Sequence, residues 1–142
     1  MGAARFLWGR NKKGRGNMIW LGRIGVALVG LFSLAMGAMA FASPVQLGEM
    51  LGLGALSPLG ANSLRADLGA LFLAGGLASL LALFAGRAQW MWGVAVLYGL
   101  AVVGRVLGLV LDGPAEGVVQ SIVVELVLVG LSVLGAKTLA RS

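Results

Sequence analysis

The chain contains no cysteine and no histidine, and these two absences remove several classes of function. Without cysteine there are no disulfides, no thiolate metal ligands and no thiol redox chemistry. Without histidine the chain lacks the usual ligand for haem, chlorophyll, zinc and copper, and the commonest general base at neutral pH. Any acid–base catalysis would depend on carboxylates. We therefore assign no catalytic, cofactor-binding or metal-ligating residue.

Charged residues are also scarce, at 11% of the 142 residues, whereas 59% are hydrophobic. A soluble domain has about a quarter of its residues charged. The mean hydropathy of +0.97 is typical of a membrane protein. Because the apolar stretches use nearly the whole length, no soluble catalytic domain remains.

Four apolar stretches are each long enough to cross a bilayer as a helix. They predict an all-α fold, a four-transmembrane-helix bundle running up-down-up-down, with a membrane domain over residues 18–142. The first stretch follows a basic segment, as in a secretory signal, but it is longer than a signal core, so we interpret it as a retained helix. The predicted spans are 19–41, 63–84, 90–111 and 117–139.

The link between the first two spans predicts a short helix on the membrane surface. Ser43 followed by Pro44 and, two residues later, Gln46 is typical of a helix start. We expect Asn62 or Ser63 to cap the second span, with Asp67 in its first turn.

Basic residues concentrate at the N-terminus, in a chain of net charge +6. We expect residues 1–17 to be flexible and to contact anionic lipids at the cytoplasmic face, or a partner protein. Nucleic acid is not expected as a partner, because basic flanks are usual in membrane proteins. The candidate contact residues are Arg5, Trp8, Arg10, Lys12, Lys13 and Arg15.

The distribution of charge also predicts the orientation in the membrane. If both termini are cytoplasmic, that side holds the N-terminal basic residues together with Arg87, Lys137 and Arg141, which makes nine of the eleven basic residues. Basic loops mark the cytoplasmic side. We therefore expect a multi-pass protein of the bacterial inner membrane. Glu49, Asp67, Asp112 and Glu116 would then lie outside.

Only Arg105 and Glu125 are ionisable and deep within a span, and the spans that carry them are joined by the loop 112–117. Counted from that loop at about 1.5 Å per residue, Arg105 lies about 10 Å and Glu125 about 12 Å below it. Charges at membrane depth face a partner or the bundle interior. The spacing therefore predicts an Arg105–Glu125 pair.

Helical spacing places further polar residues near this pair. Tyr98 and Asp112 share a face with Arg105, and Ser121 shares one with Glu125. Residues at the outer end of the second span lie at a suitable level to join them. Two interpretations stay open: an ion pair that fixes helix register, and a polar site for a small ligand or a lipid headgroup. The full candidate cluster is Arg105, Glu125, Asp67, Arg65, Asn62, Tyr98, Asp112 and Ser121.

From Ala61 to Leu139 the chain carries Asn62 to Gly69, Gly104-Arg105, Asp112-Gly113-Pro114 and Glu125 in that order. This pattern resembles a widespread bacterial family of four-helix membrane proteins catalogued as a domain of unknown function, which is in turn distantly similar to the DoxX-like proteins. The resemblance leaves out the basic N-terminus. It implies the same fold and the same outer cluster, but no substrate.

The sequence favours a non-enzymatic accessory or structural subunit of a larger membrane assembly, whose partner is another membrane protein or a second copy. The first alternative is a protein that binds a lipid or a small hydrophobic molecule in an outer polar pocket. The second is an isomerase-like membrane enzyme in which Glu125 and Asp67 act as carboxyl groups of different pKa.

Overall fold

The computed structural model describes the backbone of residues 2–141 and the side chains of residues 14–141. Within this part of the chain every regular element is helical. The elements are α1 (Gly2–Ala42), α2 (Pro44–Met50), α3 (Pro58–Leu64), a π-helical turn η1 (Arg65–Gly69), α4 (Ala70–Phe84), α5 (Trp90–Leu111) and α6 (Val118–Leu139).

Four helical segments are long and apolar enough to cross a membrane, with mean hydropathies between 1.9 and 2.3. Helices of 22 residues, such as α5 and α6, extend about 33 Å, which matches the hydrocarbon core of a bilayer. The chain is therefore an all-α, multi-pass membrane protein, as its sequence predicts. The four segments are Gly14–Ala42, Pro58–Phe84, Trp90–Leu111 and Val118–Leu139.

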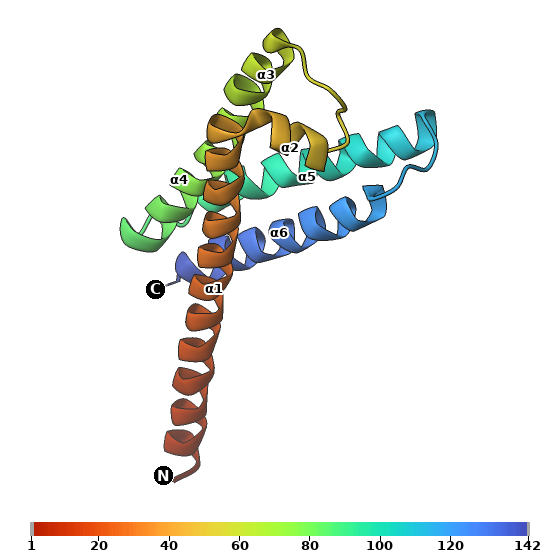
Figure 1. Cartoon of the computed structure of the whole chain (residues 1–142). Coiled ribbons are helices and arrows are strands. Elements are labelled where there is room, and N and C mark those ends of the chain that lie inside the picture. Colours follow the sequence, from red (N-terminus) through yellow and green to blue (C-terminus); the bar gives the residue numbers. More distant parts are fainter. Residues whose placement is uncertain (1, 142) are drawn as a thin grey trace.

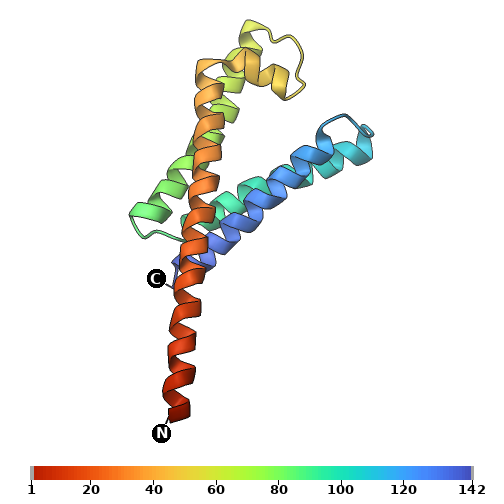
Figure 2. The same cartoon turned by 60° about the horizontal axis from the view of Figure 1, so that its bottom comes forward.

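The four spans form two pairs, each of neighbouring antiparallel helices (Figure 1). α1 packs along α4 with η1 beside it, and α5 packs along α6. The C-terminal half of α6 also contacts α1, which joins the two pairs at that end. Away from it the pairs diverge, and a second view shows the same divergence (Figure 2). The bundle is thus closed at one end and splayed at the other.

Glycines allow the helices to approach closely where they are in contact. A Cβ atom added to Gly30 of α1 would lie 2.9 Å from Ser79 Cβ of α4. A Cβ atom added to Gly135 of α6 would lie even closer to the Val26 side chain of α1. In lipid, where the hydrophobic effect does not drive helices together, such close packing is a main source of association.

One buried hydrogen bond connects the two helix pairs. Tyr98 Oη on α5 lies 2.7 Å from Ser33 Oγ on α1, and both residues are buried. The Tyr98 ring also lies against Phe32 of α1, with 6.4 Å between the ring centroids. Because α1 and α5 belong to different pairs, these contacts fix one pair against the other.

The helix starts between the first two spans differ in part from the prediction. α2 begins at Pro44 with Ser43 at its N-cap position, as expected, but the Ser43 side chain makes no capping hydrogen bond. The prediction that Asn62 or Ser63 caps the second span is wrong. The helix begins at Pro58, where the Ser57 hydroxyl accepts a hydrogen bond from the backbone N–H of Gly60, 3.1 Å away.

Helix α1 begins at Gly2, so the first span continues without a break from the basic N-terminal segment. The mobility of residues 1–17 stays a prediction. Arg15 is exposed. The other candidate lipid or partner contacts have side chains outside the described residues, namely Arg5, Trp8, Arg10, Lys12 and Lys13.

Candidate functional site

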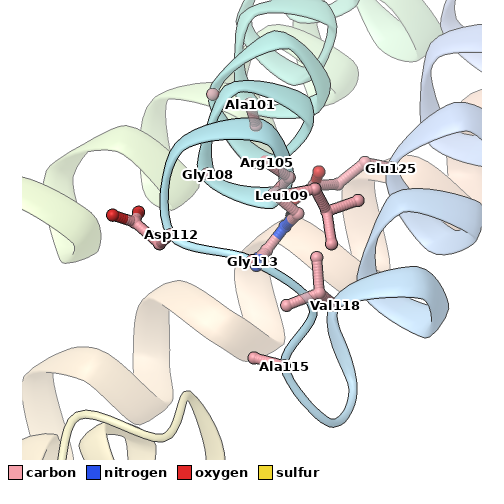
Figure 3. Close-up of a pocket in the computed structure, with 10 residues that line it drawn as sticks. Ala101, Arg105, Gly108, Leu109, Asp112, Gly113, Ala115, Val118 and Glu125 are labelled. Carbon is pink, nitrogen blue, oxygen red and sulfur yellow. Dashed lines mark hydrogen bonds and ion pairs between the residues drawn. The ribbon is translucent and has the colours of Figure 1, made fainter.

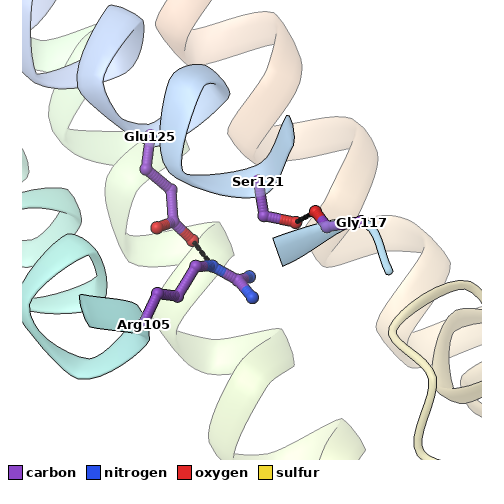
Figure 4. Close-up of polar contacts among 4 residues, drawn as sticks. All are labelled: Arg105, Gly117, Ser121 and Glu125. Atoms are coloured by element: carbon purple, nitrogen blue, oxygen red, sulfur yellow. Dashed lines mark hydrogen bonds and ion pairs between the residues drawn. The ribbon is translucent and has the colours of Figure 1, made fainter. Parts of the chain in front are cut away.

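Arg105 on α5 and Glu125 on α6 form an ion pair, with 2.7 Å between Arg105 Nε and Glu125 Oε1 (Figure 4). The residues reach each other because the connection between α5 and α6 is short and turns at two glycines with positive φ, Gly113 and Gly117. A left-handed backbone conformation is unfavourable for other residues. The turn thereby sets the antiparallel register that places Arg105 of α5 opposite Glu125 of α6.

The ion pair does not use all of its hydrogen-bonding capacity. Glu125 Oε2 is buried and has no hydrogen-bond partner within the described residues. Arg105 donates through Nε, and its two terminal nitrogens point away from the carboxylate (Figure 4). The Arg105 side chain is 33% exposed and that of Glu125 is 12% exposed. A guanidinium carries five N–H donors in a fork that suits two parallel bonds to one carboxylate. Among the residues whose side chains are described, Arg105 engages one of these donors.

A pocket of about 400 Å³ lies beside the ion pair, and α5, α6 and their connecting loop form all of its lining (Figure 3). Glycines on α5 open it: a Cβ at Gly104 would have no atom within 4 Å, and one at Gly108 would meet only the Asp112 carboxylate at 3.8 Å. Asp112 lies at its edge, directed away from Arg105 (Figure 3). The lining residues are Ala101, Gly104, Arg105, Gly108, Leu109, Asp112, Gly113, Ala115, Val118 and Glu125.

Three candidate residues therefore meet at this pocket: Arg105, Glu125 and Asp112. Tyr98 shares their helical stripe, but it is hydrogen-bonded to Ser33 on α1. Ser121 donates to the carbonyl of Gly117 at 3.0 Å (Figure 4). Neither residue lines the pocket.

The candidates on the second span do not join the pocket. Arg65 Nε donates to the carbonyl of Phe41 at 3.1 Å, which ties η1 to the last turn of α1. Asn62 and Asp67 are exposed on α3 and η1, and these elements pack in the other helix pair. The physical reason is the divergence of the two pairs. It also leaves Asp67 and Glu125 apart, so the carboxyl pair of an isomerase-like site is not assembled.

Within the described residues no group of histidine, cysteine, aspartate and glutamate side chains could hold a metal ion. The charged groups that line the pocket are one guanidinium and two carboxylates.

The sequence did not predict the divergence of the two helix pairs or the empty volume beside Gly104. The spacing of Gly104 and Gly108 was the one signal for that empty volume, but the same spacing is equally typical of close helix packing.

No curated protein and no solved structure matches the chain. Residues 21–136 match a family described as a domain of unknown function, DUF4345. The match begins within α1 and ends near the close of α6, so it includes the ion pair, the pocket and the interhelical Tyr98–Ser33 hydrogen bond. The match covers most of the chain, and the protein is therefore a member of the DUF4345 family.

Proposed function

We propose that this protein is a non-enzymatic membrane protein that binds a phospholipid headgroup in the pocket beside Arg105 and Glu125. The observation that carries the proposal is the Arg105 guanidinium, a third exposed and with unused donors, next to a pocket of about 400 Å³. A charged group within a membrane span is costly, and Glu125 pairs with this one through a single hydrogen bond, to Nε. A phosphate oxygen is a suitable partner, because guanidinium donors match its geometry.

The incomplete ion pair supports this function over a purely structural one. A pair that only fixed helix register would gain most from two parallel hydrogen bonds between the guanidinium and the carboxylate. This pair has one bond, and Glu125 Oε2 is left without a partner. The carboxylate instead holds the arginine side chain through Nε and leaves the terminal nitrogens available to a ligand.

The test is native mass spectrometry of the full chain extracted in mild detergent, with the bound lipids identified. Arg105→Leu should lose the lipid while keeping its helical circular dichroism and its elution volume. Arg87→Leu is the matched control, because Arg87 is exposed in the loop before α5 and lies outside the pocket. Retention of the same lipid by a folded Arg105→Leu variant would refute the function.

A second function, a subunit of a larger membrane assembly, is favoured by the splayed arrangement of the helix pairs (Figure 2). Val110 and Leu111 at the diverging end of α5 are 76% and 78% exposed. A photo-crosslinker at Val110 should form one adduct of fixed mass and stoichiometry in the native membrane. The same group at Leu31, which is 68% exposed on α1, should form none. If the protein stayed uncrosslinked with the photo-crosslinker at either position, this role would be contradicted.

We propose further that the protein lies in a bacterial inner membrane with both termini cytoplasmic, which follows from the distribution of basic residues. The absence of native cysteine makes the test direct, since single cysteines can be introduced without background. Ala115→Cys in the α5–α6 loop should react with a membrane-impermeant maleimide added to whole cells. Gln89→Cys in the α4–α5 loop should react only after the membrane is opened, and the reverse pattern would invert the orientation.

A further inference from the structure

We propose that the pocket selects a zwitterionic phospholipid headgroup over an anionic one, with the phosphate at Arg105 and the ammonium group at Asp112. This inference rests on the proposed lipid-binding function and names the chemical class of its ligand.

The charge of the pocket lining is the first argument. Arg105 is its single cation, and Glu125 already neutralises it. Asp112 adds a second carboxylate, so the lining carries a formal charge of −1. A headgroup with net negative charge would meet an excess of negative charge, whereas a zwitterion brings its own cation. Like charges brought together at a binding surface repel each other and disfavour the ligand that carries the excess charge.

The second argument is the order of the charges along α5. Arg105 precedes Asp112 by seven residues, which is about 10 Å along the helix, and Asp112 is the residue at which the helix ends. The cation is therefore deeper in the span and the carboxylate is nearer the membrane surface. A phospholipid carries its phosphate on the glycerol and its ammonium group two carbons further out, so it presents the opposite charges in the matching order.

Asp112 is available for this role. It is exposed, and no hydrogen bond or ion pair to another described residue engages its carboxylate. In Figure 3 it lies at the edge of the pocket, directed away from Arg105. The open face at Gly104 and Gly108 leaves room for the glycerol of a lipid whose headgroup lies between Arg105 and this edge.

The residues around the pocket also contribute negative charge. Glu116 is exposed in the same loop, directly before Gly117, and adds negative charge to the loop that borders the pocket. No lysine contributes to the pocket lining. The pocket therefore differs from the basic clusters that hold anionic lipids, which rely on several lysines and arginines together.

The experiment uses the full-length protein exchanged into micelles that contain equimolar phosphatidylethanolamine and phosphatidylglycerol. Native mass spectrometry gives the ratio of the two lipids bound per chain. We expect phosphatidylethanolamine to exceed phosphatidylglycerol about tenfold, the ratio that one charge-assisted hydrogen bond supports.

Asp112→Asn removes the carboxylate charge and keeps the size of the side chain, and it should bring the ratio close to one. Glu49→Gln is the matched control, because Glu49 is an exposed acidic residue on α2, outside the pocket. It should leave the ratio unchanged. Equal changes in both variants would mean that general surface charge causes the preference, and would overturn the assignment to Asp112.

The outcomes separate this inference from the function on which it rests. Bound lipid that disappears in Arg105→Leu, but is phosphatidylglycerol as often as phosphatidylethanolamine in the natural protein, supports lipid binding and overturns the selection of a zwitterion. Lipid that persists in a folded Arg105→Leu variant overturns both. Selective loss of phosphatidylethanolamine in Asp112→Asn supports both.

Discussion

The hydrogen bond between Ser33 on α1 and Tyr98 on α5 allows a quantitative prediction, because removal of either hydroxyl has a different effect. The two oxygens are 2.7 Å apart, and Ser33 and Tyr98 are 0% and 3% exposed. Each hydroxyl can be removed with little change of shape, by Ser33→Ala or Tyr98→Phe. The structure predicts that the serine substitution is the more harmful.

Tyr98→Phe leaves the serine hydroxyl with another acceptor. Ser33 is in the interior of α1, so its hydroxyl can turn to the carbonyl of Val29, four residues earlier. Ser79 and Ser132 already bond in this way, to the carbonyls four residues before them, at 2.9 Å and 2.7 Å. The loss of free energy of unfolding should then be that of one interhelical hydrogen bond in a membrane, about 0.6 kcal/mol.

Ser33→Ala leaves the Tyr98 hydroxyl buried without its partner. Ser33 is the one hydrogen-bond partner of that hydroxyl among the described residues. A buried polar group without a partner costs about 1–3 kcal/mol. Once Tyr98→Phe has removed the hydroxyl, Ser33→Ala should cost less than about 0.5 kcal/mol, because no group is then left unpaired. The two substitutions are therefore strongly non-additive.

Reversible unfolding by sodium dodecyl sulfate in mixed micelles, followed by circular dichroism, gives the four free energies of this cycle. The control is Ser121→Ala, in which a half-buried serine hydroxyl near the splayed end loses a bond to the carbonyl of Gly117 within its own segment. It should change stability little. A cost of Tyr98→Phe equal to or above that of Ser33→Ala, or full additivity, would show that the hydroxyls are not coupled in this way.

Two further predictions concern close packing and capping. Gly135→Ala should lower the free energy of unfolding by about 1–3 kcal/mol, because the new methyl group would overlap the Val26 side chain. Gly130→Ala is the control, because a Cβ at Gly130 has no atom within 4 Å, and it should be neutral or stabilising by up to about 1 kcal/mol. Equal effects would contradict the close approach of α1 and α6. Ser57→Ala should cost about 1 kcal/mol and increase hydrogen exchange at the Gly60 amide, since the cap of α3 is lost; unchanged exchange would contradict the cap.

The presence of four spans was predictable because a long apolar stretch is a property of the local sequence. The bounds expected for the third span, 90–111, agree with α5, and those expected for the fourth, 117–139, differ from α6 by one residue at the start. The start of the second span was misplaced because Asn62 and Ser63 are good capping residues in an isolated segment. Ser57-Pro58 is an equally good start, and only the surrounding structure selects it.

The Arg105–Glu125 contact was also predictable, because few variables determine it. A loop of six residues permits only an antiparallel hairpin of α5 and α6, and counting turns from that loop places both residues at one depth. The cost of an isolated charge in a membrane then favours the pair. The predicted neighbours on α3 and η1 depend on how two separate helix pairs meet, and neither spacing nor charge determines that.

The closed end of the bundle explains why the pairs separate where they do. Gly135 of α6 packs against Val26 of α1, and the Ser33–Tyr98 bond lies across the pairs, so a close glycine contact and a buried hydrogen bond hold this end together. Beyond it α5 carries the exposed side chains of Val103, Val106, Leu107 and Val110, which lack such contacts. Side chains of this kind gain as much from lipid as from another helix. The same divergence that removes Asn62 and Asp67 from the cluster leaves Arg105 partly uncovered, and the proposed phospholipid headgroup would occupy the side of the guanidinium that no helix covers.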